Sequence, residues 1–201
     1  MTMTQQRPFP LFSRILHWTM AAMILAMLFI GIAMVASLTH YHGLVAIHKP
    51  LGIAILVLVV VRLINRLFHP APPLPAAMPG WQRFAAHASH VVLYGLMLIL
   101  PLVGWGMLSA ARDPIVLFGT LHLPPILPHD AGLYAVLRQT HTVLALLLFA
   151  TILAHLAAAL MHALIFRDGV FASMATGKTH GKDRDEDPGA DNSMRKTLSD
   201  R

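Results

Sequence analysis

The sequence alternates long apolar runs with shorter polar or proline-rich segments. Four runs reach the roughly 20 residues that a helix needs to cross about 30 Å of hydrocarbon. They cover residues 15–38, 44–67, 88–109 and 140–166. The first run is longer than the apolar part of a signal peptide, about 7 to 15 residues, so we interpret it as a retained helix. The pattern predicts an all-α integral membrane protein with a four-helix bundle.

The segments between the runs indicate one domain with a polar tail. The first connection is a short turn at 39–42, and the second, HPAPPLPAAMPGW, is rich in prolines that prevent helix. Both connections favour antiparallel neighbours, whereas the third, 110–139, is long enough to carry function. Residues 177–201 are dense in charge and nearly free of apolar residues, which is typical of disorder. We expect a transmembrane domain over 1–176 and a disordered cytoplasmic tail over 177–201.

The composition supports a membrane location and excludes several kinds of cysteine-dependent sites. Hydrophobic residues make up 56% of the 201 residues and charged residues 12%, which is unusual for a soluble domain. The chain has no cysteine, which excludes disulfides, cysteine-ligated iron–sulfur clusters and covalent c-type haem.

The chain has a net charge of +6, and its Lys and Arg residues are divided unequally between the two sides of the predicted membrane domain. Twelve of the fifteen Lys and Arg residues lie in the N-terminal segment, the second connection or the C-terminal tail, and only Lys49, Arg112 and Arg138 lie on the other side. The positive-inside rule then predicts that both termini are cytoplasmic. Because the cations are not interleaved with aromatic residues on a soluble face, no nucleic-acid partner is expected.

Acidic residues are absent from the predicted spans. None occurs before Asp113, and six of the nine lie in the tail. Ion-coupled transporters and proton pumps usually place carboxylates at membrane depth. This absence disfavours a metal-ion transporter, although a pathway built from histidines alone stays open.

The fourth apolar run carries two histidines on one helical face. His141 and His155 are fourteen residues apart, which in a helix places them within about 40° of each other and about 21 Å apart along the axis. The topology puts His17, at the cytoplasmic start of the first helix, level with His155. It puts His48, at the outer start of the second, level with His141.

Two imidazoles at one depth on different helices are what a b-type haem needs for axial ligation by two histidines. Two such pairs predict two stacked haems. The same fourteen-residue step leads from His17 to Gly31 and from His90 to Gly104, where a missing side chain would leave room for the macrocycle. Five cations are candidate partners of the haem propionates: Arg14, Arg62 and Arg66 at the inner level, and Lys49 and Arg138 at the outer level.

The remaining histidines receive less specific interpretations. His40, His42, His69 and His180 are expected to be loop or tail residues, and His122 and His129 to be solvated in the outer loop. His162 is interpreted as interfacial. For His87 and His90 three alternatives stay open: an interfacial position, an alternative ligand, or part of a quinone site.

Four segments resemble the bacterial cytochrome b561 family. They are RILHWTMAAMI, AIHKPLGIAILVLVVVRLINRLFHPAPPLP, AAHASHVVLYGLMLILPLVGW and QTHTVLALLLFATILAHLAAALMHALIFRDGV, and together they span about residues 12–172. The resemblance implies a multi-pass dihaem cytochrome of the bacterial inner membrane, with His17, His48, His141 and His155 as ligands. It also implies electron exchange with ubiquinone in the respiratory chain, with superoxide oxidation at the periplasmic face as one activity.

Ligation by two histidines fills both axial positions of an iron, so electron transfer is the expected chemistry. The resulting interpretation is a transmembrane electron carrier between ubiquinone and a periplasmic donor, either superoxide or a redox protein. In the first case the protein would be an enzyme, a superoxide:ubiquinone oxidoreductase. Two alternatives stay open: a haem b anchor subunit of a separate dehydrogenase or hydrogenase, and a histidine-based metal transporter.

Overall fold

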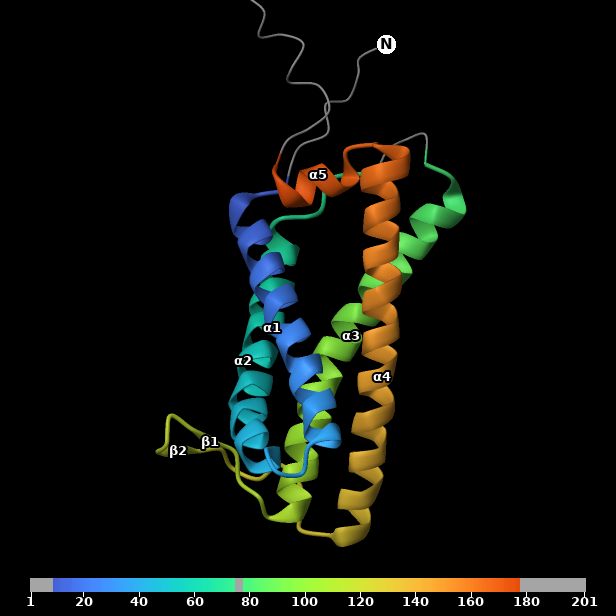
Figure 1. Ribbon diagram of the computed structural model, residues 1–201. Coiled ribbons are helices and arrows are strands. Elements are labelled where there is room, and N and C mark those ends of the chain that lie inside the picture. The colour runs from blue at the N-terminus through green and yellow to red at the C-terminus, as the bar shows by residue number, and fades with distance from the viewer. Residues whose placement is uncertain (1–8, 75–77, 178–201) are drawn as a thin grey trace, which may run out of the picture.

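The computed structural model describes residues 9–74 and 78–177, and its main elements are long helices running side by side (Figure 1). The long helices in this part of the chain are α1 (Leu11–Ala36), α2 (Tyr41–Phe68), α3 (Gly80–Ala111) and α4 (Ala131–Met161). A short π-helix, η1 (His162–Phe166), continues α4. The helices α1, α2 and α3, and α4 together with η1, are each long and apolar enough to cross a membrane. The predicted four-helix membrane architecture is therefore confirmed.

The helices are longer than the apolar runs that predicted them. α3 begins at Gly80 directly after Pro79, and α4 begins at Ala131, where the Asp130 carboxylate accepts a hydrogen bond from Leu133 N at 2.6 Å. Hydropathy marks only the part of a helix that hydrocarbon surrounds, whereas caps and prolines decide where the helix begins. The outer connection is therefore shorter than expected and covers residues 112–130.

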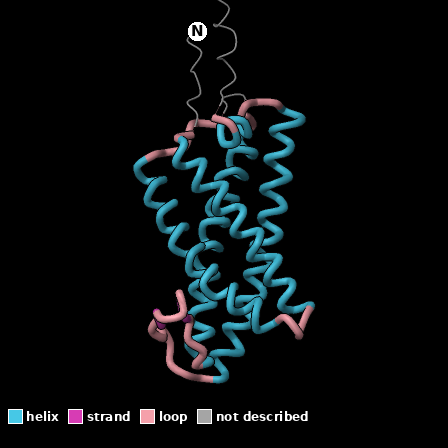
Figure 2. The backbone as a smooth tube through the Cα atoms, turned by 60° about the vertical axis from the view of Figure 1, so that its left-hand side comes forward, coloured by secondary structure: helices cyan, strands magenta, loops and turns pink. Residues whose placement is uncertain are grey.

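Two small elements lie outside the predicted pattern. β1 (Val116–Leu117) pairs antiparallel with β2 (Leu121–His122) in the outer connection. At the other end of the bundle, α5 (Val170–Ala175) turns across the helix ends (Figure 2). Only Gly177 of the predicted tail, 177–201, belongs to the described residues, and the rest of that prediction lies outside them.

The start of α1 and the end of the described chain lie at the same end of the bundle. The Arg14 guanidinium donates to the backbone oxygens of Met174 at 3.3 Å and Ala175 at 2.9 Å. Those carbonyls belong to the C-terminal turn of α5, where helical oxygens have no intrahelical partner. Arg14 therefore fastens α5 to the first turn of α1.

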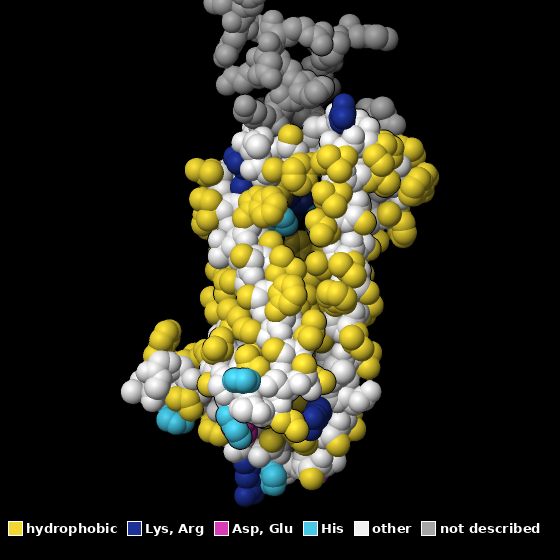
Figure 3. Space-filling view, in the orientation of Figure 1, with side chains coloured by type: hydrophobic (Ala, Val, Ile, Leu, Met, Phe, Trp, Pro, Cys, Tyr) yellow, Lys and Arg dark blue, Asp and Glu magenta, His cyan; other side chains and the backbone are white. Residues whose placement is uncertain are grey.

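The packed core is a layer halfway along the helices. Every long helix contributes to it: Met20, Ile24, Ile55, Val59, Leu96, Leu100 and Leu148. Val59 has no exposed surface. Figure 3 shows hydrophobic side chains over the middle of the visible face, with Lys and Arg toward the two ends. Apolar side chains thus fill the bundle between its ends and also cover its lipid-facing surface.

Candidate functional site

Four histidines meet in pairs at two levels of the bundle. The rings of His48 and His141, from α2 and α4, have centroids 6.3 Å apart. At the end that carries α5, the rings of His17 and His155, from α1 and α4, have centroids 6.5 Å apart. The structure therefore brings together the members of both predicted pairs, which we call the outer pair and the inner pair.

These separations match two imidazoles on opposite sides of one metal ion. An imidazole nitrogen binds a metal at about 2 Å and lies about 1 Å from its ring centroid, so two such rings have centroids roughly 6 Å apart. In the described part of the chain, no group of three or more His, Asp or Glu side chains is placed to hold a bare ion. Each pair offers two donors, the number that a haem iron takes from the protein in a bis-histidine site.

The two histidines of the outer pair are half-buried, and their Nδ1 atoms are enclosed. Within the described residues, the Nδ1 atoms of His48 and His141 have no hydrogen-bond partner. A buried polar atom without a partner costs about 1 to 3 kcal/mol. Coordination of a metal ion through a ring nitrogen is an interaction that would stabilise these two imidazoles.

Gly104 of α3 sets the position of one outer ring. A Cβ at residue 104 would lie 3.3 Å from Cε1 and 3.5 Å from Nδ1 of His141. The sequence predicted that this glycine makes room for the macrocycle, and the structure shows that it makes room for the imidazole of His141. Gly31, the other glycine in that prediction, has open space around its Cβ position.

Gly104→Ala is expected to disturb the outer pair selectively. The new methyl group would displace the His141 ring by a few tenths of an ångström, because its contact with Cε1 is tighter than an ordinary van der Waals contact. If a haem is held by the outer pair, we expect altered electron paramagnetic resonance g-values for that haem and partial loss of it. Gly43→Ala is the matched control, since it adds the same methyl group in open space at an exposed position near the outer end of α2. An equal effect of both substitutions would contradict this role for Gly104.

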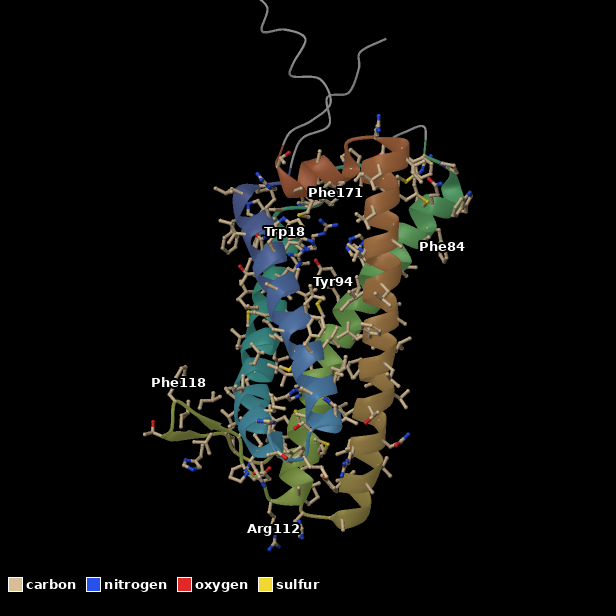
Figure 4. The ribbon with its side chains drawn as sticks, in the orientation of Figure 1. Trp18, Phe84, Tyr94, Arg112, Phe118 and Phe171 are labelled. Carbon is tan, nitrogen blue, oxygen red and sulfur yellow. The ribbon has the colours of Figure 1, made fainter. Side chains whose placement is uncertain are left out.

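The inner pair lies beside a polar network centred on Arg62. The Arg62 guanidinium is 3.1 Å from Nδ1 of His17 and donates to the Tyr94 hydroxyl at 3.0 Å. Asn65 Nδ2 donates to the hydroxyl of the buried Ser13 at 2.7 Å. Figure 4 shows Tyr94 between the helices on the side of the bundle where α5 lies, and Figure 3 shows histidine and Lys or Arg side chains in an opening there. Of the predicted inner cations, Arg62 is therefore the one that contacts the inner pair.

The other predicted cations have different surroundings. Arg14 holds α5, and Arg66 is exposed one turn beyond Arg62. Lys49 Nζ is 2.6 Å from Asp113 Oδ2 in an ion pair between α2 and the outer connection. Arg138 is exposed, with its guanidinium 3.5 Å from the Tyr134 hydroxyl. Pattern and depth placed these cations at the correct ends of the helices but did not identify their partners.

His90 is a third histidine at the inner level. Its ring centroid is 5.4 Å from that of His155, with an interplanar angle of 82°. Its Nδ1 lies 2.6 Å from the Ala86 backbone oxygen, within its own helix. The sequence indicated that His90 begins a helix near the inner end, but not that it contacts the His155 ring.

Sequence reasoning also missed two polar partners. His162 Nδ1 is 2.6 Å from Asp168 Oδ2, whereas the sequence predicted only an interfacial position for this histidine. Tyr94, the hydroxyl acceptor of Arg62, was read as part of an apolar run. Its position four residues after His90 on α3 is the signal that would have placed it on the same face.

A cleft of about 400 Å³ lies where the outer connection folds over the end of α3. Trp105 Nε1 donates to the Pro124 oxygen at 3.1 Å, and His129 Nδ1 is 2.7 Å from the Ala110 oxygen. The lining is mostly apolar, with Arg112 and His129 among its residues. Two other basic side chains of this end lie elsewhere, His122 on β2 and Arg138 on α4.

Comparison with known proteins supports a cytochrome. The family model described as prokaryotic cytochrome b561 matches residues 8–177. Cytochrome b561 homolog 2 of Escherichia coli K12 is 34% identical over 123 residues, which are 59% of this chain and 64% of that relative. The match thus spans less than two thirds of the length of that relative. A probable superoxide oxidase, CybB, of Yersinia pestis is 29% identical over 168 residues, which are 81% of this chain and 93% of the relative.

Proposed function

Because the chain belongs to the prokaryotic cytochrome b561 family, we propose that it binds two b-type haems, one at each histidine pair. His17 and His155 would hold the inner haem, and His48 and His141 the outer haem. The observation that carries this proposal is the separation of 6.3 and 6.5 Å between paired ring centroids at two depths. In the outer pair the Nδ1 atoms have no hydrogen-bond partner among the described residues, so no protein group competes for these ring nitrogens.

A haem with two histidine ligands supplies reversible one-electron transfer and has no free coordination position for a substrate. The protein residues hold the two sites apart and dry. The core layer around Val59 and Leu148 fills the bundle between them with apolar side chains. Arg62 would place a positive charge beside the inner haem, where a propionate would be its partner.

We further propose that the inner pair faces the cytoplasm. The support is the distribution of Lys and Arg, twelve against three, which the positive-inside rule places with the larger number in the cytoplasm. The described ends of the chain lie at the inner level, so the outer connection would face the periplasm.

The proposed activity is electron transfer between ubiquinone and a donor at the outer face. Superoxide is the donor we favour, because one relative whose sequence aligns over 93% of its length carries the name probable superoxide oxidase. Arg112 and His129 offer basic side chains near the outer pair's end of the bundle, which suit a small anion. Ubiquinone would accept the electrons within the membrane.

Purified protein tests the proposal directly. We expect a reduced-minus-oxidised spectrum of b-type haem, and two haems per chain by pyridine haemochromogen assay. Stopped-flow mixing with superoxide and, separately, with ubiquinol would then show which of them reduces the haems. Purified, membrane-assembled protein without b-type absorbance would overturn the assignment.

Replacement of Arg62 is expected to lower the midpoint potential of the inner haem. A nearby positive charge favours the reduced state, and loss of a charge interaction of about 0.5 to 1.5 kcal/mol corresponds to roughly 20 to 60 mV for one electron. Redox titration of Arg62→Gln would measure the shift. Arg167→Gln is the control, because it removes an exposed charge at the same end of the bundle. An unchanged potential in Arg62→Gln, or a larger shift in Arg167→Gln, would contradict the role of Arg62.

A further inference from the structure

The hairpin of β1 and β2 extends sideways from the bundle. Figure 1 shows it beside α2, at the end opposite α5, and the rotated view in Figure 2 also shows it standing away from the helices. Its base is held in place: Lys49 of α2 pairs with Asp113, Ile115 is buried, and Leu123 N donates to the Ile115 oxygen at 2.9 Å. The hairpin therefore has a defined position next to a membrane-spanning helix.

The tip of the hairpin is unusually apolar. Phe118 is 95% exposed and Leu121 is 55% exposed. Residues 114–128 contain no Lys, Arg, Asp or Glu. In Figure 4 the Phe118 side chain points back along the helices toward the end with α5, whereas Arg112 points away from the bundle. The exposed aromatic ring is thus directed toward the level of the membrane.

The turn itself does not explain the choice of phenylalanine. Phe118 has φ 51° and Gly119 has φ 74°. Three residues, 118–120, connect the strands, and Thr120 N donates to the Leu117 oxygen at 3.2 Å, which closes a β-turn with residues 118 and 119 at its centre. A β-turn with positive φ at both central positions favours Asn, Asp or Gly at the first of them. A bulky side chain is disfavoured there, so the residue at 118 satisfies some requirement other than backbone conformation.

We propose that this hairpin is an interfacial anchor that inserts Phe118 into the lipid headgroup region of the adjacent leaflet. β1 contacts α2, so the hairpin lies beside a helix long and apolar enough to cross the membrane. Aromatic side chains favour the membrane interface, and a segment without Lys, Arg, Asp or Glu avoids the cost of moving those charges out of water. A docking site for a soluble protein would be expected to carry charges that guide the encounter, and this hairpin has none. The anchor holds the outer connection, and with it the cleft residues, at a fixed height.

The absence of native cysteine permits a direct test. Phe118→Cys would carry one nitroxide label in full-length, haem-loaded protein reconstituted into vesicles of phosphatidylethanolamine and phosphatidylglycerol. Power saturation compares collisions with oxygen, which concentrates in lipid, and with a water-soluble nickel chelate. Arg112→Cys is the matched control at the same end of the bundle.

We expect oxygen collisions to dominate at position 118 and nickel collisions to dominate at position 112. Dominant nickel collisions at 118 would place the tip in water and overturn the proposal. Protection from both reagents at 118 would show that a protein, either a partner or a second copy, covers the tip, and would overturn it too. If Phe118→Cys does not assemble with haem, Leu121→Cys on β2 carries the same test with the same outcomes.

Discussion

His141→Ala is expected to reduce the haem content from two per chain to one. The outer pair supplies only His48 and His141, and in the described structure no other histidine ring stacks against either of them. With one ligand lost, the outer haem would keep a single protein bond, and the inner pair on the far side of the core layer would stay intact. Pyridine haemochromogen assay and redox titration would measure the stoichiometry and the surviving potential.

The proposed pairing of His48 with His141 also predicts the result of a second substitution. His48→Ala should give the same spectrum and the same surviving potential as His141→Ala, since both residues would hold one haem. His129→Ala is the control, because this histidine lies in the outer connection and contacts the Ala110 backbone oxygen. Equal loss of both haems in His141→Ala, or survival of different haems in the two variants, would refute the pairing.

The depth of each histidine was predictable because helical geometry fixes it. The rise per residue converts the interval between His141 and His155 into a distance across the membrane. Alternating helix directions then place His17 and His48 at matching depths. The structure agrees at both levels, with the paired rings next to each other. These inferences need only the apolar runs and the order of the helices.

Contacts between distant segments were less predictable. Arg14 and Arg62 are both cations near the inner end, yet one holds α5 and the other contacts His17. The difference depends on the rotation of the helices about their axes and on the position of α5. The hydropathy pattern did not predict that α5 crosses the end of the bundle. Lys49 likewise pairs with Asp113, 64 positions away. The spacing of residues within one segment cannot show which segment packs against it.

The hairpin was missed for a related reason. Its strands are two residues long, too short for an alternation of apolar and polar residues to be detected. The positive φ of Phe118 also contradicts the usual turn signals, which favour Asn or Gly at that position. Local sequence preferences therefore predict the four helices well and this outer connection poorly.

Replacement of His155 should remove the inner haem, and replacement of His90 should not. The His90 and His155 centroids are 5.4 Å apart, closer than the roughly 6 Å expected for two rings on one iron. The 6.5 Å between His17 and His155 fits that separation. His90 is also held by the Ala86 oxygen on its own helix. We therefore expect one haem per chain in His155→Ala and two in His90→Ala.

The same two variants separate the proposed ligand role from a supporting one. If both haems are needed to carry electrons through the bundle, ubiquinone reduction by an outer donor should fall to background in His155→Ala, since one haem cannot connect sites at depths about 21 Å apart. His90→Ala should retain turnover with both haem spectra present. Two haems in His155→Ala would show that His90 replaces it as a ligand, and one haem in His90→Ala would show that His90, rather than His17, is the partner of His155. Haem counting and ubiquinone-reduction assays on the same preparations distinguish these outcomes.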